Sequence, residues 1–330
     1  MVDGVAVRRF AMPMPRMSAR GLLAFPRDAR RAWSTFAAAA STFGPEILHV
    51  QCFSANGAYA TQLSRSLDVP LVVTLQGETM MDNANIYDRS IAMRQALRWG
   101  LDRATAVTAP SRYVLADAES RFGLARGRGL VIPNGVDLDE AVAEQPLALP
   151  FQRFVLAVGR VVAKKGFDLL LQAFQRIPVN DCELGLVIGG SGPALHELVQ
   201  AAATAGLADR VAFPGSLSRG QIAWAMRNAA VFVLPSRIEP FGIVVLEALR
   251  AGCPVVASMH GGATEIVRDG VDALVVDPLD TTALARAIAC IIGDDGLAGR
   301  LRLRGPQTAS AFAWPGIAGR YRALYERIRT

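Results

Sequence analysis

The sequence predicts an α/β fold made of two doubly wound parallel sheets. Ten short runs rich in valine, isoleucine and leucine recur along the chain of 330 residues. Strands that are buried on both faces have this continuous apolar composition. Segments with helical composition, such as 92–104 and 168–177, lie between most of these runs. The alternation is typical of parallel sheets that are covered by helices on both faces.

The predicted strands are too many for one ordinary sheet, so we expect two domains. The segment 137–152 has mixed charge, two prolines and no periodicity, which is typical of an interdomain linker. Two α/β halves with a cleft between them follow from this division. The ten predicted strands lie at 47–53, 71–77, 106–111, 130–135, 154–160, 184–192, 210–215, 231–236, 254–258 and 273–278.

The composition fits a globular protein, with 52% hydrophobic residues, 19% charged residues and a mean hydropathy of +0.28. No run approaches the roughly 18 apolar residues of a membrane span. The first residues lack the continuous apolar segment of a secretory signal, so we expect a cytoplasmic protein. Four cysteines lie far apart among apolar neighbours, and we expect reduced, buried thiols: Cys52, Cys182, Cys253 and Cys290.

The net charge of +6 is concentrated at the start of the chain. The first 31 residues hold seven arginines against two aspartates, a net charge of +5. This pattern is compatible with contact to an anionic membrane surface or to an anionic acceptor. A solvated, arginine-rich face is the alternative. The apolar residues interleaved with the arginines are Phe10, Met14, Leu22, Leu23 and Phe25.

The junctions after predicted strands of the second half are the first places to expect a site, because ligands bind beyond the carboxyl ends of parallel strands. After the strand at 154–160 come Lys164 and Lys165, the two lysines of a chain with 33 arginines. Together with Arg160 they place cations and a flexible backbone where a diphosphate could bind. The "GGSGP" at 189–193 resembles a dinucleotide fingerprint only superficially, because Leu195 occupies its third glycine position.

The segment 235–256 is the most informative junction. Glu239 and Glu247 flank Pro240 and Gly242, and an apolar helix follows. Proline and glycine here suit a turn that ends in a helix N-terminus, whose unpaired N–H groups attract an anion. We expect both glutamates to face the cleft, one toward a sugar and the other toward a ribose.

The second half closely resembles the glycosyltransferase family 4 group, retaining enzymes of the GT-B fold, and the first half is similar more loosely. The matching segments include "VGRVVAKKGFDLLLQAF" at 158–174, "VFVLPSRIEPFGIVVLEALRAGCPVVAS" at 231–258, "GGATEIVRDGVDALVVDPLD" at 261–280 and "VPLVVTLQGE" at 69–78. The resemblance implies an acceptor-binding Rossmann-like domain over 1–148 and a nucleotide-sugar-binding one over 149–311. A C-terminal helix over 312–330 would pack back toward the first domain.

The resemblance implies transfer of a hexosyl group from a nucleotide diphosphate-sugar to a hydroxyl acceptor, with retention and without a metal or cofactor. The product would be a polysaccharide, lipopolysaccharide or glycolipid. Arg160 and Lys165 match the basic pair that holds the donor diphosphate, whereas Lys164 matches no fixed position. Glu239 matches the glutamate against the donor sugar, and Glu247 the one on the ribose. The other implied donor-binding residues are Gly190 and the backbone of Phe241, Gly242, Ile243 and Val244.

On the acceptor side, Gln76 and Gly77 end the predicted strand at 71–77. The family commonly has a histidine in place of Gln76. An amide can hydrogen-bond a sugar hydroxyl but carries no proton, so we expect no general base there. Of the histidines, His260 is the one expected near the cleft. The family's opening strand and glycine-rich loop have no match in this sequence, so the N-terminal domain is expected to be incomplete.

The expected mechanism follows from the charge that develops on the leaving group. Departure of the nucleotide diphosphate creates negative charge, which Arg160, Lys165 and a helix N-terminus would stabilise. The acceptor hydroxyl is expected to attack from the face from which the diphosphate leaves, with a phosphate oxygen taking its proton; Glu239 is then no nucleophile. Two alternatives stay open, a nucleotide-sugar 2-epimerase and an inactive or accessory nucleotide-sugar-binding protein. The scattered arginines do not predict nucleic-acid binding.

Overall fold

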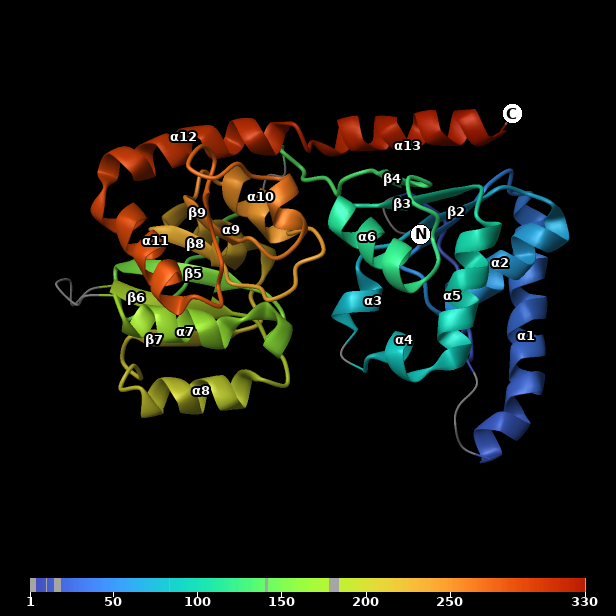
Figure 1. The fold of residues 1–330 in the computed structure, drawn as a ribbon, viewed down its shortest axis with the longest axis horizontal. Helices are drawn as coiled ribbons and strands as arrows, with labels where there is room; N and C mark the ends of the chain where they lie inside the picture. Colours follow the sequence, from blue (N-terminus) through green and yellow to red (C-terminus); the bar gives the residue numbers. More distant parts are fainter. Residues whose placement is uncertain are drawn as a thin grey trace. The chain divides into compact units, whose positions relative to one another are not determined.

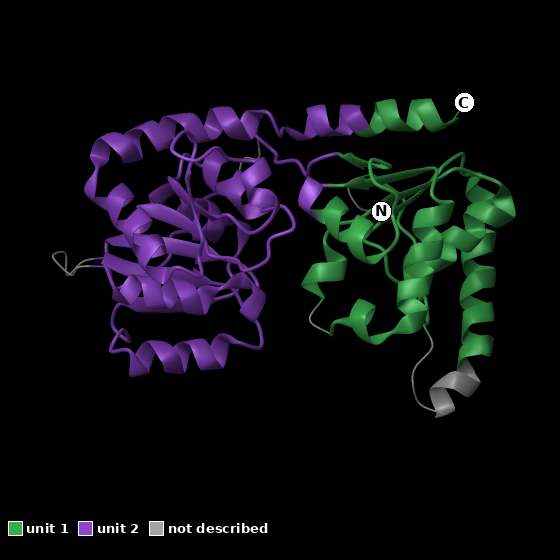
Figure 2. Ribbon diagram, viewed as in Figure 1, with its two compact units in different colours: residues 1–109, 114–131, 321–330 green, residues 110–113, 132–320 purple. Residues whose placement is uncertain are grey.

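The computed structural model, drawn in Figure 1, describes residues 4–9, 11–14, 19–82, 84–139, 142–177 and 184–329, without the side chains of 19–24. The chain divides into two compact units (Figure 2). Unit 1 comprises 1–109, 114–131 and 321–330, and unit 2 comprises 110–113 and 132–320. The domain boundaries predicted after residues 148 and 311 stay a prediction.

Unit 1 contains a parallel sheet in the order β1-β2-β3-β4. Its strands are β1 (Leu48–Gln51), β2 (Leu71–Thr74), β3 (Ala106–Ala109) and β4 (Gly129–Val131). Each residue of β2 and β3 is buried, as their continuous apolar composition predicts. The helices are α1 (Ala19–Phe43), α2 (Ala55–Leu67), α3 (Glu78–Met81), α4 (Ile86–Arg89), α5 (Ile91–Arg103) and α6 (Arg112–Arg121).

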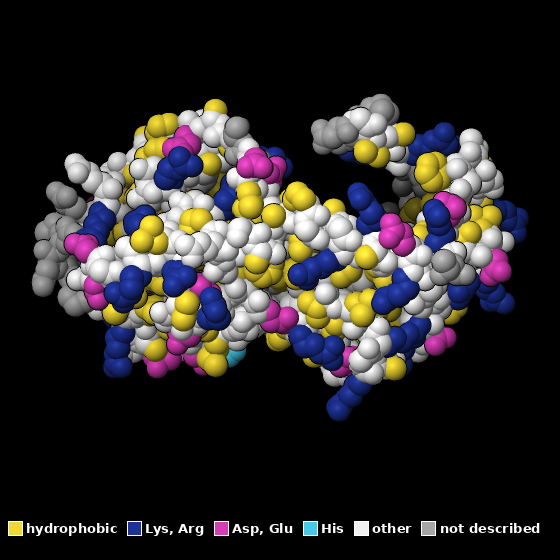
Figure 3. Space-filling view, turned by 90° about the horizontal axis from the view of Figure 1, so that it is seen from above, with side chains coloured by type: hydrophobic (Ala, Val, Ile, Leu, Met, Phe, Trp, Pro, Cys, Tyr) yellow, Lys and Arg dark blue, Asp and Glu magenta, His cyan; other side chains and the backbone are white. Residues whose placement is uncertain are grey.

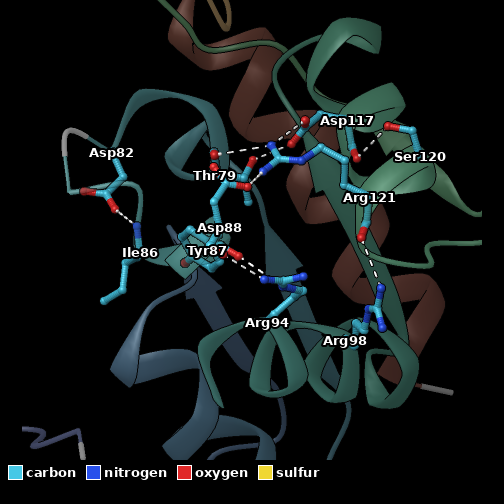
Figure 4. Close-up of polar contacts among 10 residues, drawn as sticks. All are labelled: Thr79, Asp82, Ile86, Tyr87, Asp88, Arg94, Arg98, Asp117, Ser120 and Arg121. Atoms are coloured by element: carbon cyan, nitrogen blue, oxygen red, sulfur yellow. Dashed lines mark hydrogen bonds and ion pairs between the residues drawn. The ribbon is translucent and has the colours of Figure 1, made fainter. Parts of the chain in front are cut away.

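A network of polar contacts joins three short helices of unit 1 (Figure 4). The Arg121 guanidinium at the end of α6 pairs with Asp117 at 2.9 Å and also with Asp88 of α4. The Thr79 hydroxyl of α3 donates to the other oxygen of Asp117 at 2.6 Å. The network fixes the helices that follow β2, where the predicted acceptor-side residues lie.

A second polar cluster holds the end of the C-terminal helix, α13 (Trp314–Arg329), within unit 1. The two ring nitrogens of His49 on β1 lie 2.6 Å from the hydroxyls of Tyr325 and Thr74. Burial lowers the pKa of His49 to about 4, so this ring is neutral near pH 7. His49 is therefore a structural hydrogen-bonding group.

Unit 2 is built on a parallel six-stranded sheet in the order β10-β9-β8-β5-β6-β7. Its strands are β5 (Arg153–Val158), β6 (Leu184–Gly189), β7 (Val211–Gly215), β8 (Val231–Leu234), β9 (Val255–Ser258) and β10 (Leu274–Val276). Its helices are η1 (Ala163–Lys165), α7 (Phe167–Gln175), α8 (Leu195–Thr204), α9 (Arg219–Asn228), α10 (Ile243–Arg250), η2 (Gly262–Glu265), α11 (Thr281–Gly293), α12 (Asp295–Ser310) and the first part of α13, up to Arg320.

Helices cover both faces of this sheet, so its strands alternate between two apolar cores. Val155 and Ala157 of β5 belong to the core beneath α7, α8 and α11. Phe154 and Leu156 of the same strand belong to the core beneath α9 and α10. Side chains of a strand point alternately to opposite faces, and here both faces are buried.

The order of the strands reverses at β5. From β5 the chain passes to β6 and β7 on one side, and then returns to β8, β9 and β10 on the other. The loops that follow β5 and β8 are therefore neighbours at the carboxyl edge of the sheet. Such a switch point is where ligands bind in open α/β sheets.

The sequence predicted the fold class correctly, because each of the ten apolar runs overlaps a strand in the described part of the chain. Several predicted strands end early: the run at 71–77 is a strand only to Thr74, and the next residues form the loop into α3. The prediction of buried thiols is wrong for Cys52 and Cys290, which are exposed, and right for Cys253. Phe10 and Cys182 lie outside the described residues, as do the side chains of Leu22 and Leu23.

No helix in the described ranges combines the length and the apolar character needed to span a membrane. Figure 3 shows Lys and Arg side chains scattered over the viewed face, with Asp and Glu side chains among them. The positive charge is not gathered into one patch on this face.

Gly166, which directly follows Lys165, offers a test of how the two loops pack. It has a φ of +67°, and an added Cβ would lie 2.0 Å from the Pro235 carbonyl oxygen. Gly270 has a φ of +71° with nothing within 4 Å of an added Cβ. We expect Gly270→Ala to lower the free energy of unfolding by about 1–2 kcal/mol, the strain of a left-handed alanine.

We expect Gly166→Ala to lose about 1–3 kcal/mol more, because the Pro235 backbone must also move. Urea unfolding of both variants measures the difference. Equal losses would contradict the tight approach of the loops after β5 and β8.

Candidate functional site

Two loops of unit 2 meet at the switch point and carry most of the predicted donor residues. The loop at 159–166 follows β5, and the loop at 235–242 follows β8. The backbone N–H of Arg237 donates to the Lys164 carbonyl at 2.9 Å. Main-chain contacts thus fix the distance between the two loops.

The predicted donor residue Gly190 supports the first loop from the other side. An added Cβ at Gly190 would lie 1.8 Å from the Gly159 carbonyl oxygen, and one at Gly192 would lie 2.2 Å from that of Val161. The Val161 N–H also donates to the Ser191 carbonyl at 2.8 Å. Gly190 and Gly192 therefore serve close backbone packing, which only residues without a Cβ permit here.

Lys165 and Glu239, 74 residues apart in sequence, form an ion pair at this junction. The Lys165 Nζ lies 2.7 Å from Glu239 Oε2, and the side chains are only 16% and 7% exposed. The Ser236 hydroxyl donates to the same oxygen at 3.2 Å. Two predicted catalytic side chains are thus in direct contact. Both charges are therefore paired in this buried position. An unpaired charge there would be strongly destabilising.

The backbone of Glu239 is held by the segment after β9. Its N–H donates to the His260 carbonyl at 3.2 Å, and its carbonyl accepts from the Gly262 N–H at 2.8 Å. An added Cβ at Gly261 would lie 2.0 Å from the Glu239 carbonyl oxygen. Sequence reasoning gave these two glycines no role, although the pair "GG" was a signal that backbone approaches closely there.

Arg237 is a second residue that sequence reasoning missed. Its guanidinium binds both carboxylate oxygens of Asp168 on α7, at 2.7 and 2.6 Å, and it donates to the Ala163 carbonyl at 2.9 Å. Burial opposes ionisation of Asp168, but the Arg237 guanidinium outweighs it and holds the pKa of that carboxyl below its ordinary value. Arg237 therefore clamps η1, the turn that presents Lys165.

The other two cations of the first loop differ from Lys165. Arg160 is exposed, and no ion pair joins it to any residue that the structure describes. Lys164 is half-buried, and its carbonyl is the acceptor for Arg237. The structure therefore brings Lys165 to Glu239, while Arg160 stays at the surface of the loop.

The N-terminus of α10 lies four residues after Glu239, at Ile243. Gly242 precedes the helix with a φ of 102°, a left-handed conformation that favours glycine. The first N–H groups of a helix, here those of Ile243 and Val244, have no acceptor within it. Phe241 is buried against Phe312, so its side chain anchors the turn and only its backbone is left to bind a ligand.

Glu247 lies one turn further along α10, in a pocket of about 510 Å³ beside α9. Arg219, Arg250 and Trp314 also line this pocket, whereas Lys165 and Glu239 do not. The two predicted glutamates thus have different surroundings. Glu239 lies in a buried ion pair, and Glu247 lines a pocket that also contains charged side chains.

In unit 1, Gln76 and Gly77 lie in the turn between β2 and α3. The Gln76 side chain donates to the Gln51 side chain at 3.3 Å, and its backbone N–H donates to the Glu78 carboxylate at 2.6 Å. That carboxylate also accepts from the Phe53 N–H at 2.7 Å. Burial raises the pKa of Glu78 despite these bonds. Glu78, which the sequence did not single out, thus joins the loops after β1 and β2.

His260, the histidine expected near the cleft, pairs with a neighbour in unit 2. Its Nε2 lies 2.7 Å from Asp277 Oδ1. The Leu279 N–H and the His260 ring together hold the pKa of Asp277 below its ordinary value. The contribution of His260 to the predicted site is its backbone carbonyl, which binds Glu239.

Two family models together match nearly the whole chain. The model described as "Glycosyl transferases group 1" matches residues 141–308, and "Glycosyltransferase Family 4" matches residues 2–140. A mannosylfructose-phosphate synthase of Agrobacterium fabrum is 35% identical over 222 residues, which are 62% of this chain. The matched part is 49% of that relative, so the chain spans about half its length.

Two solved structures are similar over most of the chain. Sucrose-phosphate synthase from Thermosynechococcus elongatus has a TM-score of 0.75 and 26% identity, and the match covers 92% of this chain and 78% of that one. Anabaena HepE in complex with UDP has a TM-score of 0.75 and 22% identity, and the match covers 89% and 82% of the two chains. The chain therefore belongs to the group 1 glycosyl transferases of Glycosyltransferase Family 4 and has their GT-B fold.

Proposed function

We propose that the chain is a retaining glycosyltransferase that moves a hexosyl group from a nucleotide diphosphate-sugar to a hydroxyl acceptor. The observation that carries the proposal is the buried Lys165–Glu239 pair at the switch point of unit 2. Membership of the family supports the reaction class. The UDP bound to the related HepE fold supports a nucleotide diphosphate as part of the donor.

The donor diphosphate would bind to the two cations after β5 and the N-terminus of α10. Arg160 is exposed and can approach a phosphate, and Lys165 lies on the rigid turn η1. The N–H groups of Ile243 and Val244 add the positive end of the helix dipole. Gly190 would contribute by packing closely against the Gly159 backbone at the start of this loop. In this proposal no divalent metal is needed to neutralise the leaving group.

The glutamates would bind the two sugars of the donor. When the diphosphate shares the ammonium of Lys165, the Glu239 carboxylate can accept a hydrogen bond from a hydroxyl of the transferred sugar. Glu247 would accept hydrogen bonds from the ribose, and its partly charged pocket suits a polar group. The backbone of Phe241 and Gly242 lies between the two glutamates in sequence. Gln76 and Gly77 would contact the acceptor in unit 1.

The transfer step is the exchange of one bond at the anomeric carbon. The bond from that carbon to the diphosphate oxygen breaks, and a bond to the acceptor oxygen forms on the same face. The acceptor proton passes to a phosphate oxygen of the leaving diphosphate. Arg160 and Lys165 stabilise the negative charge that develops on this oxygen. Such electrostatic stabilisation is usually the largest single contribution to the rate enhancement.

The acceptor class and the location follow from weaker signals and are part of the proposal. The acceptor would be a saccharide or a lipid-linked saccharide in polysaccharide, lipopolysaccharide or glycolipid synthesis. The arginine-rich start of the chain, with Arg27, Arg30 and Arg31 exposed on α1, suits an anionic membrane surface at the cytoplasmic face.

Lys165→Ala should lower kcat by about 100-fold or more, because one charge-stabilising donor to the leaving diphosphate is lost. The matched variant Lys164→Ala should change kcat by about fivefold at most, because its half-buried side chain is outside the Lys165–Glu239 pair. Steady-state transfer assays measure both. Since Lys165→Ala also leaves Glu239 unpaired, assays are made below the melting temperature of each variant. Equal losses at both lysines would show that the wrong lysine has been assigned.

Glu239 should remain unmodified during turnover, because the proposed attack is direct. Peptide mass mapping after incubation with donor, quenched in acid, should find the Glu239 peptide at its unaltered mass. The Glu239→Gln variant, which keeps the shape of the side chain, provides the reference peptide. A glycosyl adduct on Glu239 would replace the front-face mechanism with a covalent one.

A nucleotide diphosphate should raise the melting temperature of the chain, because it binds the folded site. At 100 times its Kd the stabilisation is about 2.7 kcal/mol. A thermal-shift screen over nucleotide diphosphates and their sugars measures this. No shift with any of them would refute the donor site.

The same screen separates the two alternatives when it is combined with product analysis. A nucleotide-sugar 2-epimerase would convert the donor without any acceptor present. An accessory binding protein would be stabilised by nucleotide diphosphate, but it would release no sugar with any acceptor.

A further inference from the structure

A pocket of about 520 Å³ lies in unit 1 between α1 and α2, and none of its lining residues belongs to the proposed site. This volume is within the range of pockets that bind small molecules. The α1 side contributes Phe25, Ala29 and Trp33, and the α2 side contributes Ala58 and Tyr59. In Figure 1 these two helices lie side by side. We call this space the α1 pocket.

The sequence of α1 explains why the pocket exists. Residues four apart lie on the same face of a helix. Ala32 and Ala40 are buried, and Phe36 between them packs on the core of unit 1. Phe25, Ala29 and Trp33 have the same spacing and form a second apolar stripe. The first stripe docks the helix, and the second lines the α1 pocket.

The pocket is open to solvent, and one polar contact holds the segment before α1 along its edge. The Tyr59 hydroxyl donates to the Pro13 carbonyl at 3.1 Å, which holds Pro13 and Met14 over α2. The Tyr59 hydroxyl is thus occupied. The walls near Met14, Trp33 and Ala58 consequently offer a ligand mainly carbon surface.

A positive charge at the edge of the α1 pocket favours apolar ligands that carry a negatively charged group. Arg30 is exposed, lines the α1 pocket, and forms no ion pair with any residue in the described ranges. Arg27 and Arg31 on the same stretch of α1 are also exposed, and Asp28 is the acid among them. A ligand with an apolar body and a negatively charged head complements this arrangement.

We propose that the α1 pocket binds the acyl chain of an anionic single-chain lipid, with its charged head on Arg30. The chain would lie between the Phe25–Ala29–Trp33 stripe and α2. Arg30 would contact a carboxylate or phosphate at the rim. This binding does not depend on sugar transfer, and it is measured without donor or acceptor.

The test uses 12-bromododecanoate at pH 8, below its critical micelle concentration, with the full chain. Bromine quenches the fluorescence of a nearby tryptophan, so Trp33 reports occupancy directly. We expect saturable quenching that Trp33→Phe removes and that the matched variant Trp99→Phe, on α5, retains. Quenching that rises without saturation, or that survives Trp33→Phe, would overturn the proposal.

Two further variants separate the pocket from the surface around it. Ala58→Phe fills the pocket and should weaken binding by about tenfold or more, because apolar contact with the acyl chain is lost. Arg30→Ala should weaken dodecanoate binding by up to about fivefold, and it should leave 12-bromododecanol unchanged. Melting temperatures near that of the unaltered chain confirm that each variant folds.

Vesicles distinguish a lipid chain in the pocket from adsorption to a membrane. Quenching of Trp33 by vesicles of brominated phosphatidylglycerol, with none by free 12-bromododecanoate, would mean that α1 rests on a bilayer and would refute the pocket proposal. An equal affinity of Ala58→Phe and the unaltered chain for free 12-bromododecanoate would also refute it.

Discussion

The ion pair between Lys165 and Glu239 is the contact on which the carboxyl edge of unit 2 depends. Removing two ions from water costs several kcal/mol for each, so such a pair persists only with close geometry and further hydrogen bonds. Both conditions are met by the 2.7 Å contact and by the Ser236 hydroxyl on the same oxygen. An anion can replace Glu239 as the partner of the Lys165 ammonium only if its negative charge is at least comparable to that of the carboxylate. A diphosphate carries such a charge.

Arg237 and Lys165 show why arginine and lysine are not interchangeable here. Arg237 binds both oxygens of Asp168, at 2.7 and 2.6 Å, and this planar, bidentate geometry suits a fixed structural clamp. Lys165 makes a single contact with one oxygen of Glu239. A compact ammonium on a flexible stem can be shared between a carboxylate and a phosphate without losing a bidentate bond. Under the proposed function, this accounts for the lysine at position 165 in a chain whose basic residues are otherwise arginines, apart from Lys164.

The sequence was sufficient for the strands, and it singled out the loops that carry Lys165 and Glu239, because both features depend on local pattern; the roles of these residues stay a prediction. Continuous apolar runs predicted the sheets, and the rule that ligands bind beyond the carboxyl ends of parallel strands pointed to the loops of Lys165 and Glu239. The strand order, which only the structure provides, makes these two loops neighbours. The Arg237–Asp168 clamp joins residues 69 positions apart, and no local pattern marks it. Cys52 and Cys290 have apolar neighbours in sequence but lie at the surface, because neighbours along a chain do not determine burial.

The first helix, α1, has a wider apolar face than the fold buries. Ala32 is buried and Phe36 packs on the core of unit 1, so this stripe holds α1 against the rest of the unit. Phe25 and Trp33 continue a second stripe of equal apolar character that is only half-buried. Apolar surface left in water costs roughly 25 cal/mol for each Å². A fold that retains such a stripe beside Arg30 gains stability when an apolar chain with a negative head covers it.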